Sequence, residues 1–262
     1  MLDKIWFIDS LLFLKIVIEK GEEMEERTIS NREDLFSFEM PPARHIQQII
    51  DAGNRSPFIS HFYSIFLSRR ASDNLMKAPL EFIVCADIYR VSRIFEKKGK
   101  LKSLDIKSLF SLAMQNAQYA ANNMVLQAQL LDLHTEYTPM TYKRAEMIIK
   151  DWNIPEKVVP LVTLSIGYPE IEPPKPSPFP NEFLFFEDEY PAANDFLVDE
   201  LMFHLGQEND LLEYYKQIEN TGASEAEKSK WTWFDLLSNS AIAWKKVHSE
   251  FKKITELCGV EF

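Results

Sequence analysis

The stretch Leu109–Leu131, LFSLAMQNAQYAANNMVLQAQLL, contains no charged residue over 23 positions. Its apolar and small residues recur at alternating spacings of four and three, which is typical of a helix that packs along one stripe: Phe110, Met114, Ala117, Ala121, Met124, Ala128 and Leu131. A membrane span is excluded because amide side chains interrupt the run, namely Gln115, Asn116, Gln118, Asn122, Asn123, Gln127 and Gln129. As one helix the stretch would be about 35 Å long.

A helix without charge on any face is not an ordinary surface helix, so protein or ligand should cover most of its circumference. The alanines along this helix permit the close approach of another helix. A single domain of this size can hardly bury so long a helix on every side. We therefore predict that the helix lies at a subunit interface; the alternative is the central helix of a monomer.

The segments around this helix show strand and helix patterns. Runs rich in aromatic and β-branched residues predict three strands, over 61–68, 80–86 and 158–166. The second run is almost continuously apolar, which indicates burial on both faces. Helical spacing predicts further helices over 43–52, 141–151, 195–220 and 228–257. The proline-rich stretch 173–180 is predicted to be extended and exposed, because proline lacks an N–H donor.

The composition excludes several classes of protein. The 262 residues carry a net charge of −11, which argues against a general nucleic-acid or anionic-membrane surface. Only seven glycines occur, and the glycine motifs of dinucleotide folds, P-loops and hydrolase elbows are absent. His134-Thr135-Glu136 has the form of a deaminase H-x-E motif, but no P-C-x-x-C completes a zinc site. Two cysteines are too few for a disulfide framework and indicate a reducing compartment.

The amino-terminal run Trp6–Ile18 is apolar but is interrupted by Asp9 and Lys15. It is too short and too charged to span a bilayer, and it lacks the basic start and small-residue cleavage site of a signal peptide. We interpret it as an amphipathic docking helix, with a partner-binding arm as the alternative. A cytoplasmic location is expected.

Five further stretches follow one another in a characteristic order: Glu26–Ser30 (ERTIS), Ala78–Arg90 (APLEFIVCADIYR), Gln115–Ala121 (QNAQYAA), Trp152–Pro169 (WNIPEKVVPLVTLSIGYP) and Pro174–Pro180 (PKPSPFP). Their order and spacing resemble the flavin-dependent nitroreductase family, especially its branch of NADPH-dependent nitroreductases and flavin reductases. The later Leu212–Tyr215, Trp231 and Trp233 are more weakly similar to the carboxy-terminal extension of that branch.

The resemblance implies an α+β fold with a mixed sheet flanked by helices. It implies an intertwined homodimer with the long central helix at the interface and one FMN per subunit held there. Three segments are expected: an amino-terminal extension over 1–22, an FMN-binding core over 23–180 and a helical extension over 181–262 that packs on the dimer. Members of the family oxidise NAD(P)H and reduce quinones, nitroaromatics or free flavin. The cofactor carries that chemistry, so neither a catalytic side chain nor a metal is expected.

The positions that match the family's FMN contacts are Arg27, Thr28, Ser30, Ser56, Ser60, His61, Thr138, Pro139, Met140, Lys175 and Ser177. Arg27, Thr28 and Lys175 are expected to hold the phosphate, which needs cations and hydroxyl donors in so acidic a protein. The loop 56–63 is expected along the ribityl chain, and the N–H of Met140 near N5 of the flavin. Taken singly, Arg27 could balance its acidic neighbours, Lys175 could be a solvated linker residue, and His61 could be a packed or surface histidine.

Three positions depart from the family's pattern. Ser30 and Ser177 stand where the family has arginines, and two lost charge-assisted hydrogen bonds would weaken FMN binding by about 3 to 6 kcal/mol, or roughly 10² to 10⁴-fold, if nothing substitutes for them. The alternative is compensation by Arg32, Arg55, Arg69 or Arg70. Pro139 stands in a segment that is glycine-rich in the family, and it has no backbone N–H donor.

Four cations are considered for the phosphates of the nicotinamide cofactor, with a solvated surface as the alternative: Lys143, Arg144, Lys228 and Lys230.

The leading hypothesis is an FMN-binding, NAD(P)H-dependent reductase of quinone-like, nitroaromatic or flavin acceptors, acting as a homodimer. The first rival is a non-enzymatic dimer of the same fold with a degenerate flavin site, which Ser30, Pro139 and Ser177 favour. The second rival is an unrelated α+β interaction module. Binding of FMN and its bleaching by NAD(P)H would distinguish the leading hypothesis from the two rivals.

Overall fold

The computed structural model describes residues 35–56, 61–69, 76–170, 181–190, 195–207, 212 and 225–260. The chain forms two compact units, one of Ile29–Glu172 with Lys246–Phe262 and one of Met1–Thr28 with Pro173–Lys245. The division expected from the sequence, at 22/23 and 180/181, stays a prediction. The predicted amino-terminal helix and the proline-rich stretch 173–180 lie outside the described residues.

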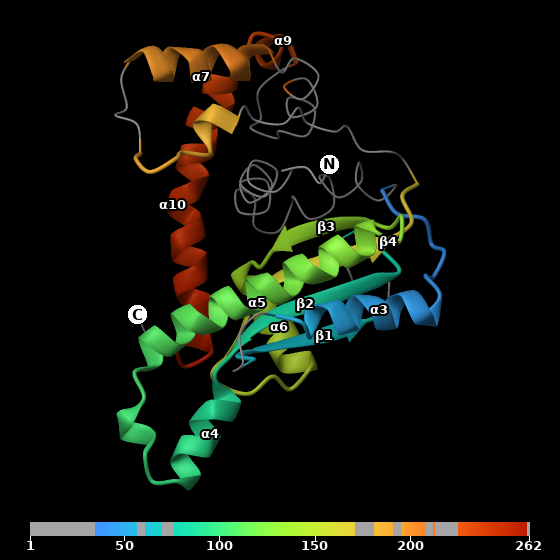
Figure 1. Cartoon of the computed structure of the whole chain (residues 1–262), viewed down its shortest axis with the longest axis vertical. Helices are drawn as coiled ribbons and strands as arrows, with labels where there is room; N and C mark the ends of the chain where they lie inside the picture. The colour runs from blue at the N-terminus through green and yellow to red at the C-terminus, as the bar shows by residue number, and fades with distance from the viewer. Residues whose placement is uncertain are drawn as a thin grey trace. The chain divides into compact units, whose positions relative to one another are not determined.

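The first unit is built on a four-stranded sheet with the order β1-β2-β4-β3 (Figure 1). Its strands are β1 (Tyr63–Ser68), β2 (Leu80–Asp87), β3 (His134–Pro139) and β4 (Val158–Gly167). The sequence predicted β1, β2 and β4, and every residue of β2 is buried as expected. The expectation of a mixed sheet needs correction for the described strands, because all three pairings among them are antiparallel.

Strand β3 was not predicted, because the sequence from His134 to Pro139 mixes polar, charged and aromatic residues without clear alternation. It is an edge strand, where such a composition is tolerated. Its residues pair with β4 in register, from His134 opposite Gly167 to Pro139 opposite Val162. Pro139 fits the last position of an edge strand because its missing N–H removes no interior ladder bond.

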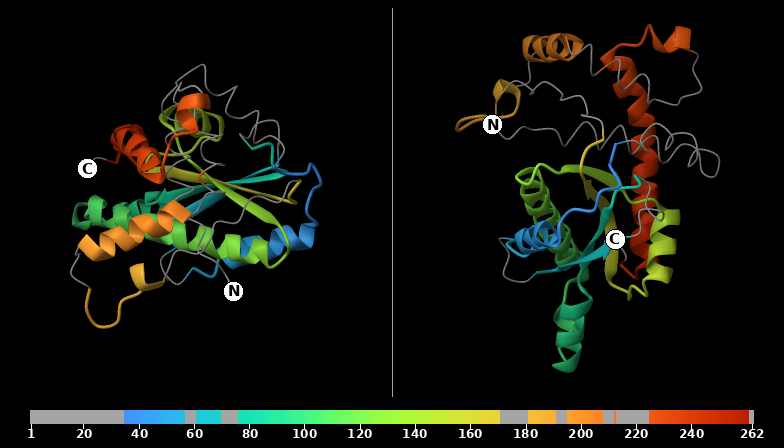
Figure 2. Two further views of the ribbon diagram at one scale, coloured as in Figure 1. Left: turned by 90° about the horizontal axis from the view of Figure 1, so that it is seen from above. Right: turned by 90° about the vertical axis from the view of Figure 1, so that its right-hand side faces the viewer.

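Helices cover both faces of the sheet (Figure 2, left). One face is covered by α3 (Ala43–Gly53) and α5 (Ile106–Gln129). The other is covered by α6 (Tyr142–Asp151) and the end of α10 (Trp233–Leu257), where Ala145, Ile148 and Ile254 join the core with Ile83 of β2. Helices α3 and α6 confirm the predicted helices over 43–52 and 141–151. Cover on both faces explains why β2 contains almost only apolar residues.

Helix α5 confirms the helix predicted from the uncharged stretch. The carboxylate of Asp105 caps its first turn by accepting from the N–H groups of Lys107 and Ser108. The face turned to the sheet and to α3 is buried and contains most of the predicted stripe: Phe110, Ala113, Asn116, Ala117, Ala120, Ala121, Met124, Val125 and Ala128. The opposite face is exposed in the single chain and carries no charge beyond Lys107. The predicted cover is therefore complete on one side only.

Three shorter elements of the chain were not predicted: α4 (Tyr89–Lys97), the 3-10 turn η2 (Leu101–Ser103) and a second 3-10 turn η3 (Asn181–Phe183). The helix predicted over 195–220 is described as α7 (Asp195–Gln207). The helix predicted from Lys228 begins instead at Trp233, after the short α9 (Glu225–Lys228). Thr232 and Asp235 explain this start, because they form a capping box in which the N–H of Thr232 donates to the carboxylate of Asp235 and the N–H of Asp235 donates to the hydroxyl of Thr232. None of the helices in the described parts of the chain combines the length and the hydropathy that a membrane span requires.

The end of β4 is a close contact point between three segments. A bridge joins Phe36 to Pro169, and the N–H of Ser37 donates to the carbonyl of Tyr168 at 2.9 Å. Gly167 leaves no room for a side chain here, since an added Cβ would lie 2.7 Å from Cδ of Pro79 and 3.1 Å from the ring of Phe36.

Replacing Gly167 with alanine is expected to lower the free energy of unfolding by about 1 to 3 kcal/mol, because the proline ring cannot move without the backbone. Chemical denaturation of the variant measures this loss. Gly206→Ala is the matched control, because an added Cβ on α7 meets nothing within 4 Å, so its stability should be unchanged or slightly higher. Equal stability of both variants would contradict the crowding of Gly167.

Candidate functional site

Of the residues matched to FMN contacts, Ser56, His61, Thr138, Pro139 and Met140 lie within the described part of the chain. The remaining positions lie outside it: Arg27, Thr28, Ser30, Ser60, Lys175 and Ser177. The structure therefore bears on the expected ribityl and ring contacts but not on the expected phosphate ligands.

Ser56 and Thr138 each carry a buried hydroxyl group with no hydrogen-bond partner in the described structure. The side chain of Thr138 is 1% exposed and that of Ser56 is 8% exposed. A buried hydroxyl without a partner is uncommon, because it has lost water and gained nothing in exchange. Both hydroxyls are therefore available to a ligand without the loss of an existing bond, and both were predicted from the sequence as ligand contacts.

Met140 follows the last residue of β3 and is itself buried. Its N–H donates to the carbonyl of Leu161 at 3.4 Å, a long and weak bond. Its side chain packs with Ala145 and Ile148 of α6. The backbone donor expected near N5 of a flavin thus points toward β4 in this structure, and the preceding Pro139 offers no second donor.

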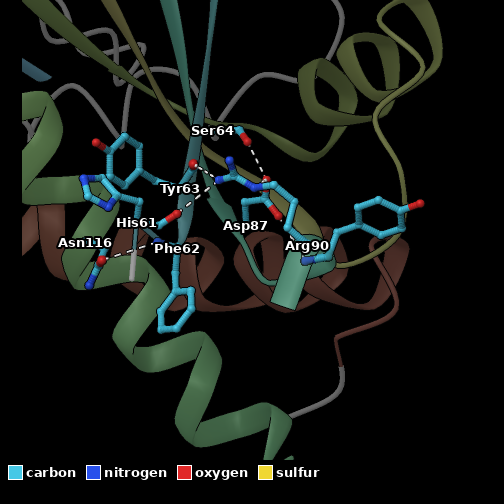
Figure 3. Close-up of polar contacts among 8 residues, drawn as sticks. His61, Phe62, Tyr63, Ser64, Asp87, Arg90 and Asn116 are labelled. Atoms are coloured by element: carbon cyan, nitrogen blue, oxygen red, sulfur yellow. Dashed lines mark hydrogen bonds and ion pairs between the residues drawn. The ribbon is translucent and has the colours of Figure 1, made fainter. Parts of the chain in front are cut away.

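His61 lies at the entrance to β1, in a network of polar contacts that sequence reasoning missed (Figure 3). The guanidinium of Arg90 donates to the carbonyls of His61 at 3.1 Å and Tyr63 at 2.6 Å. The same guanidinium pairs with the carboxylate of Asp87 at 3.2 Å, and Ser64 donates its hydroxyl to that carboxylate. Asp87 is buried, and Arg90 and Ser64 compensate the negative charge of its carboxylate.

This network fixes the backbone that leads into β1. His61 has a positive φ of 46°, a conformation that costs energy for a residue with a side chain. The hydroxyl of Tyr63 donates to the carbonyl of Gly53 at 3.0 Å and ties β1 to the end of α3. Burial raises the pKa of Tyr63, partly offset by the positive charge of Arg90. The feature of the sequence that could have indicated this network is the i, i+3 spacing of Asp87 and Arg90 at the end of a buried strand.

A cavity of about 540 Å³ lies beside this network. His61, Ser64 and Arg90 line it together with apolar residues of β1 and with Met124 of α5. The hydrogen-bonding groups of Ser64 and Arg90 are already engaged with Asp87. The network is therefore a structural support for the loop before β1 rather than a set of free catalytic groups.

Arg144, one of the cations considered for the nicotinamide cofactor, is not on a solvated surface. It is buried, and its Nη2 donates to Oε1 of the buried Glu81 at 2.5 Å. Lys228 is buried as well. Lys143 and Lys230 are exposed, so the alternative of a solvated surface fits these two residues best.

Among the described residues there is no group of three or more side chains that could hold a metal ion.

The fold of this chain is similar to those of solved nitroreductases and flavin oxidoreductases. The structure of the NfrA1 nitroreductase from B. subtilis matches 90% of this chain and 98% of its own, with a TM-score of 0.68 and 20% identity. The structure of the hypothetical oxidoreductase YcnD from Bacillus subtilis matches 90% of this chain and 98% of its own, with a TM-score of 0.69 and 17% identity. The NADPH:FMN oxidoreductase from Vibrio harveyi, complexed with NAD+, matches 88% of this chain and 91% of its own, with a TM-score of 0.61 and 15% identity. The predicted α+β, nitroreductase-like fold is thereby confirmed.

In sequence, the chain is similar to the FMN reductase (NADPH) of Bacillus subtilis, with 25% identity over 160 residues. The matched region is 60% of this chain and spans 61% of the length of that protein. No family model matches the chain. The resemblance stated from the five stretches is confirmed by these relatives, which are nitroreductases and NADPH:FMN oxidoreductases at low identity.

Proposed function

We propose that the chain is an FMN-dependent NAD(P)H oxidoreductase that reduces quinone-like, nitroaromatic or flavin acceptors. The observation that carries this proposal is the similarity to an FMN reductase (NADPH) in sequence together with a nitroreductase fold over nine-tenths of the chain. A cytoplasmic location and a homodimer complete the proposal. The uncharged helix α5 supports the homodimer.

The described residues fit a flavin in part. The unpartnered hydroxyls of Ser56 and Thr138 are suitable donors to the ribityl chain or the ring. Arg27, Thr28 and Lys175 would hold the phosphate, with Ser30 and Ser177 nearby, while Ser60 and His61 would complete the contacts to the ribityl chain. When bound, FMN supplies the hydride chemistry. The protein's own part is to orient the ring, exclude water and match the negative charge of the phosphate with cations.

The homodimer is supported by the exposed face of α5. Its residues alternate at spacings of three and four and are all uncharged: Leu112, Gln115, Tyr119, Asn122, Leu126 and Gln129. Leu112, Tyr119 and Leu126 are each more than 40% exposed in the single chain. An exposed, uncharged stripe in which large apolar side chains alternate with amides along a long helix favours association with another protein surface. We propose that a second copy of the chain covers it.

A second candidate is a non-enzymatic dimer of the same fold. The bond between the N–H of Met140 and the carbonyl of Leu161 favours it, because the backbone donor expected near N5 is then already engaged. Without such a donor the flavin would bind more weakly and its reduced form would be less stabilised.

Titration of the purified full chain with FMN, followed by NADPH and NADH oxidation with a quinone acceptor, tests the proposal. The expected result is quenching of flavin fluorescence, then acceptor-dependent oxidation of NAD(P)H. Thr138→Val is expected to weaken FMN binding by about 10-fold through the loss of one hydrogen bond. Thr135→Val on the same strand is the matched control and should leave the affinity unchanged. A dimer that ignores FMN would reject the enzyme and support the second candidate.

A further inference from the structure

A second, larger cavity lies on the face of the sheet opposite α5. It measures about 810 Å³, which is within the usual size of small-molecule sites. One side of α6 forms its wall, and the ends of β1 and the start of β2 form its floor. Its lining residues are Leu67, Ser68, Arg69, Glu81, Ile83, Arg144, Met147, Ile148, Asp151 and Trp152. Not one of Ser56, His61, Thr138, Pro139 and Met140 is among them, so the cavity is separate from the described residues expected at the flavin.

Arg144 is the unusual residue of this cavity. Its guanidinium is buried and pairs with Glu81 through Nη2, while its Nε has no hydrogen-bond partner among the described residues. Other buried polar atoms in this part of the chain lack a partner too, but they belong to hydroxyl and imidazole groups. Nε of Arg144 belongs to a group that is always charged, and such a group is rarely left with an unused donor inside a protein. A fixed donor of this kind suits an anionic acceptor.

The other charges in the cavity limit the anion. Arg69 lies exposed at the end of β1 and adds a second cation, while Asp151 at the end of α6 and Glu81 are acidic. The two cations and the two carboxylates give the lining no net charge. A dianion such as phosphate would therefore be repelled by Glu81 and Asp151 without an excess of positive charge to offset that repulsion. A ligand with one negative charge can approach Arg69 and Arg144 with less repulsion. The carboxylate is the common group of this kind, and it matches the geometry of an arginine donor.

Apart from Ser68, the rest of the lining is apolar and aromatic. Leu67, Ile83 and Ile148 form an apolar surface, and Met147 is half exposed beside them. Trp152 is held edge-on by Phe66, with ring centroids 5.7 Å apart, and remains half-buried at the cavity. An indole held in this way offers a face or edge to a planar ring, and a methionine sulfur favours the same partner.

We propose that this cavity is a binding site for a planar aromatic monocarboxylate. The ring lies among Leu67, Met147 and Trp152, and the carboxylate accepts hydrogen bonds from Nε of Arg144 and from Arg69. Nε is buried in this structure, so binding requires that side chains of α6 move to admit the carboxylate. The site does not require bound flavin, so its test is independent of the test of the proposed reductase activity.

Isothermal titration of the full chain with 2-naphthoate tests the site, with and without excess FMN. The expected result is saturable binding that FMN does not alter, while the neutral analogue 2-naphthalenemethanol binds at least about 10-fold more weakly. Competition by FMN would place the ligand at the flavin and overturn the proposal. Displacement by inorganic phosphate would show a site for any anion and overturn it as well, as would the absence of binding.

Two variants identify the donors. Arg144→Lys keeps a cation beside Glu81 but removes the Nε–H group, and it is expected to weaken 2-naphthoate by about 10-fold. Arg69→Gln changes only an exposed side chain and is expected to cause a similar loss, which keeps the test valid if Arg144→Lys does not fold. Lys150→Gln removes an exposed charge from the same helix without touching the cavity, so it is the matched control. Unchanged binding in Arg69→Gln, or an equal loss in Lys150→Gln, would overturn the proposal.

Discussion

Glu81→Ala is expected to lower the free energy of unfolding by about 3 to 5 kcal/mol, the largest stability loss that a single polar substitution should cause in the described structure. Glu81 and Arg144 are both buried, and they join β2 to α6. Removal of the carboxylate leaves a guanidinium that cannot lose its charge and that already has an unpartnered Nε. The buried guanidinium then loses the counter-ion that it pairs with in the core. Urea denaturation followed by circular dichroism measures the loss.

The double variant Glu81→Leu with Arg144→Met is the informative control. A buried ion pair contributes little net stability when both charges are replaced by apolar groups of similar size, because the cost of desolvation disappears with them. We therefore expect the double variant to recover most of the stability that Glu81→Ala loses. Glu96→Ala, which breaks the exposed pair with Arg93, should change the stability by less than about 1 kcal/mol. A double variant as unstable as Glu81→Ala would contradict this account of the pair.

The ion pair also shows what the sequence could not predict. Glu81 lies inside an apolar run that was correctly predicted as a strand buried on both faces, but a single acidic residue in such a run does not reveal its partner. Arg144 lies 63 positions away on a helix that was also predicted correctly. Only the crossing of α6 over β2 brings the two together. The pattern therefore predicts elements and their buried faces, whereas pairs between distant elements depend on the tertiary arrangement.

The same distinction holds for the site. Ser56 and Thr138 were predicted by resemblance to a family motif, and both carry buried hydroxyls without partners. The role of Met140 was predicted from its position in the same motif, yet its N–H is directed to Leu161. A motif gives a residue's place along the chain, but the direction of a backbone donor follows from strand pairing. Because β3 itself was not predicted, its hydrogen bonds to β4 could not be anticipated.

Leu126→Glu is expected to convert the proposed homodimer into a monomer. Leu126 lies in the middle of the exposed, uncharged face of α5 and is 44% exposed in the single chain. If a second copy covers this face, a carboxylate there is buried without a partner, which costs several kcal/mol and raises the dissociation constant by about 100-fold or more. The fold of the chain itself should not change, because the side chain points away from the sheet and from α3.

Sedimentation velocity of the two proteins over a range of concentrations measures this effect. Leu101→Glu is the matched control, because Leu101 is a similarly exposed leucine on η2 and lies outside the face of α5. We expect Leu101→Glu to sediment as the unaltered chain does and Leu126→Glu to sediment as a monomer at every concentration. FMN affinity should fall along with dimerisation only if the flavin is held at the interface. A dimer that persists in Leu126→Glu would show that α5 is not the subunit contact, and an unaltered chain that is already monomeric would remove the homodimer from the proposed function.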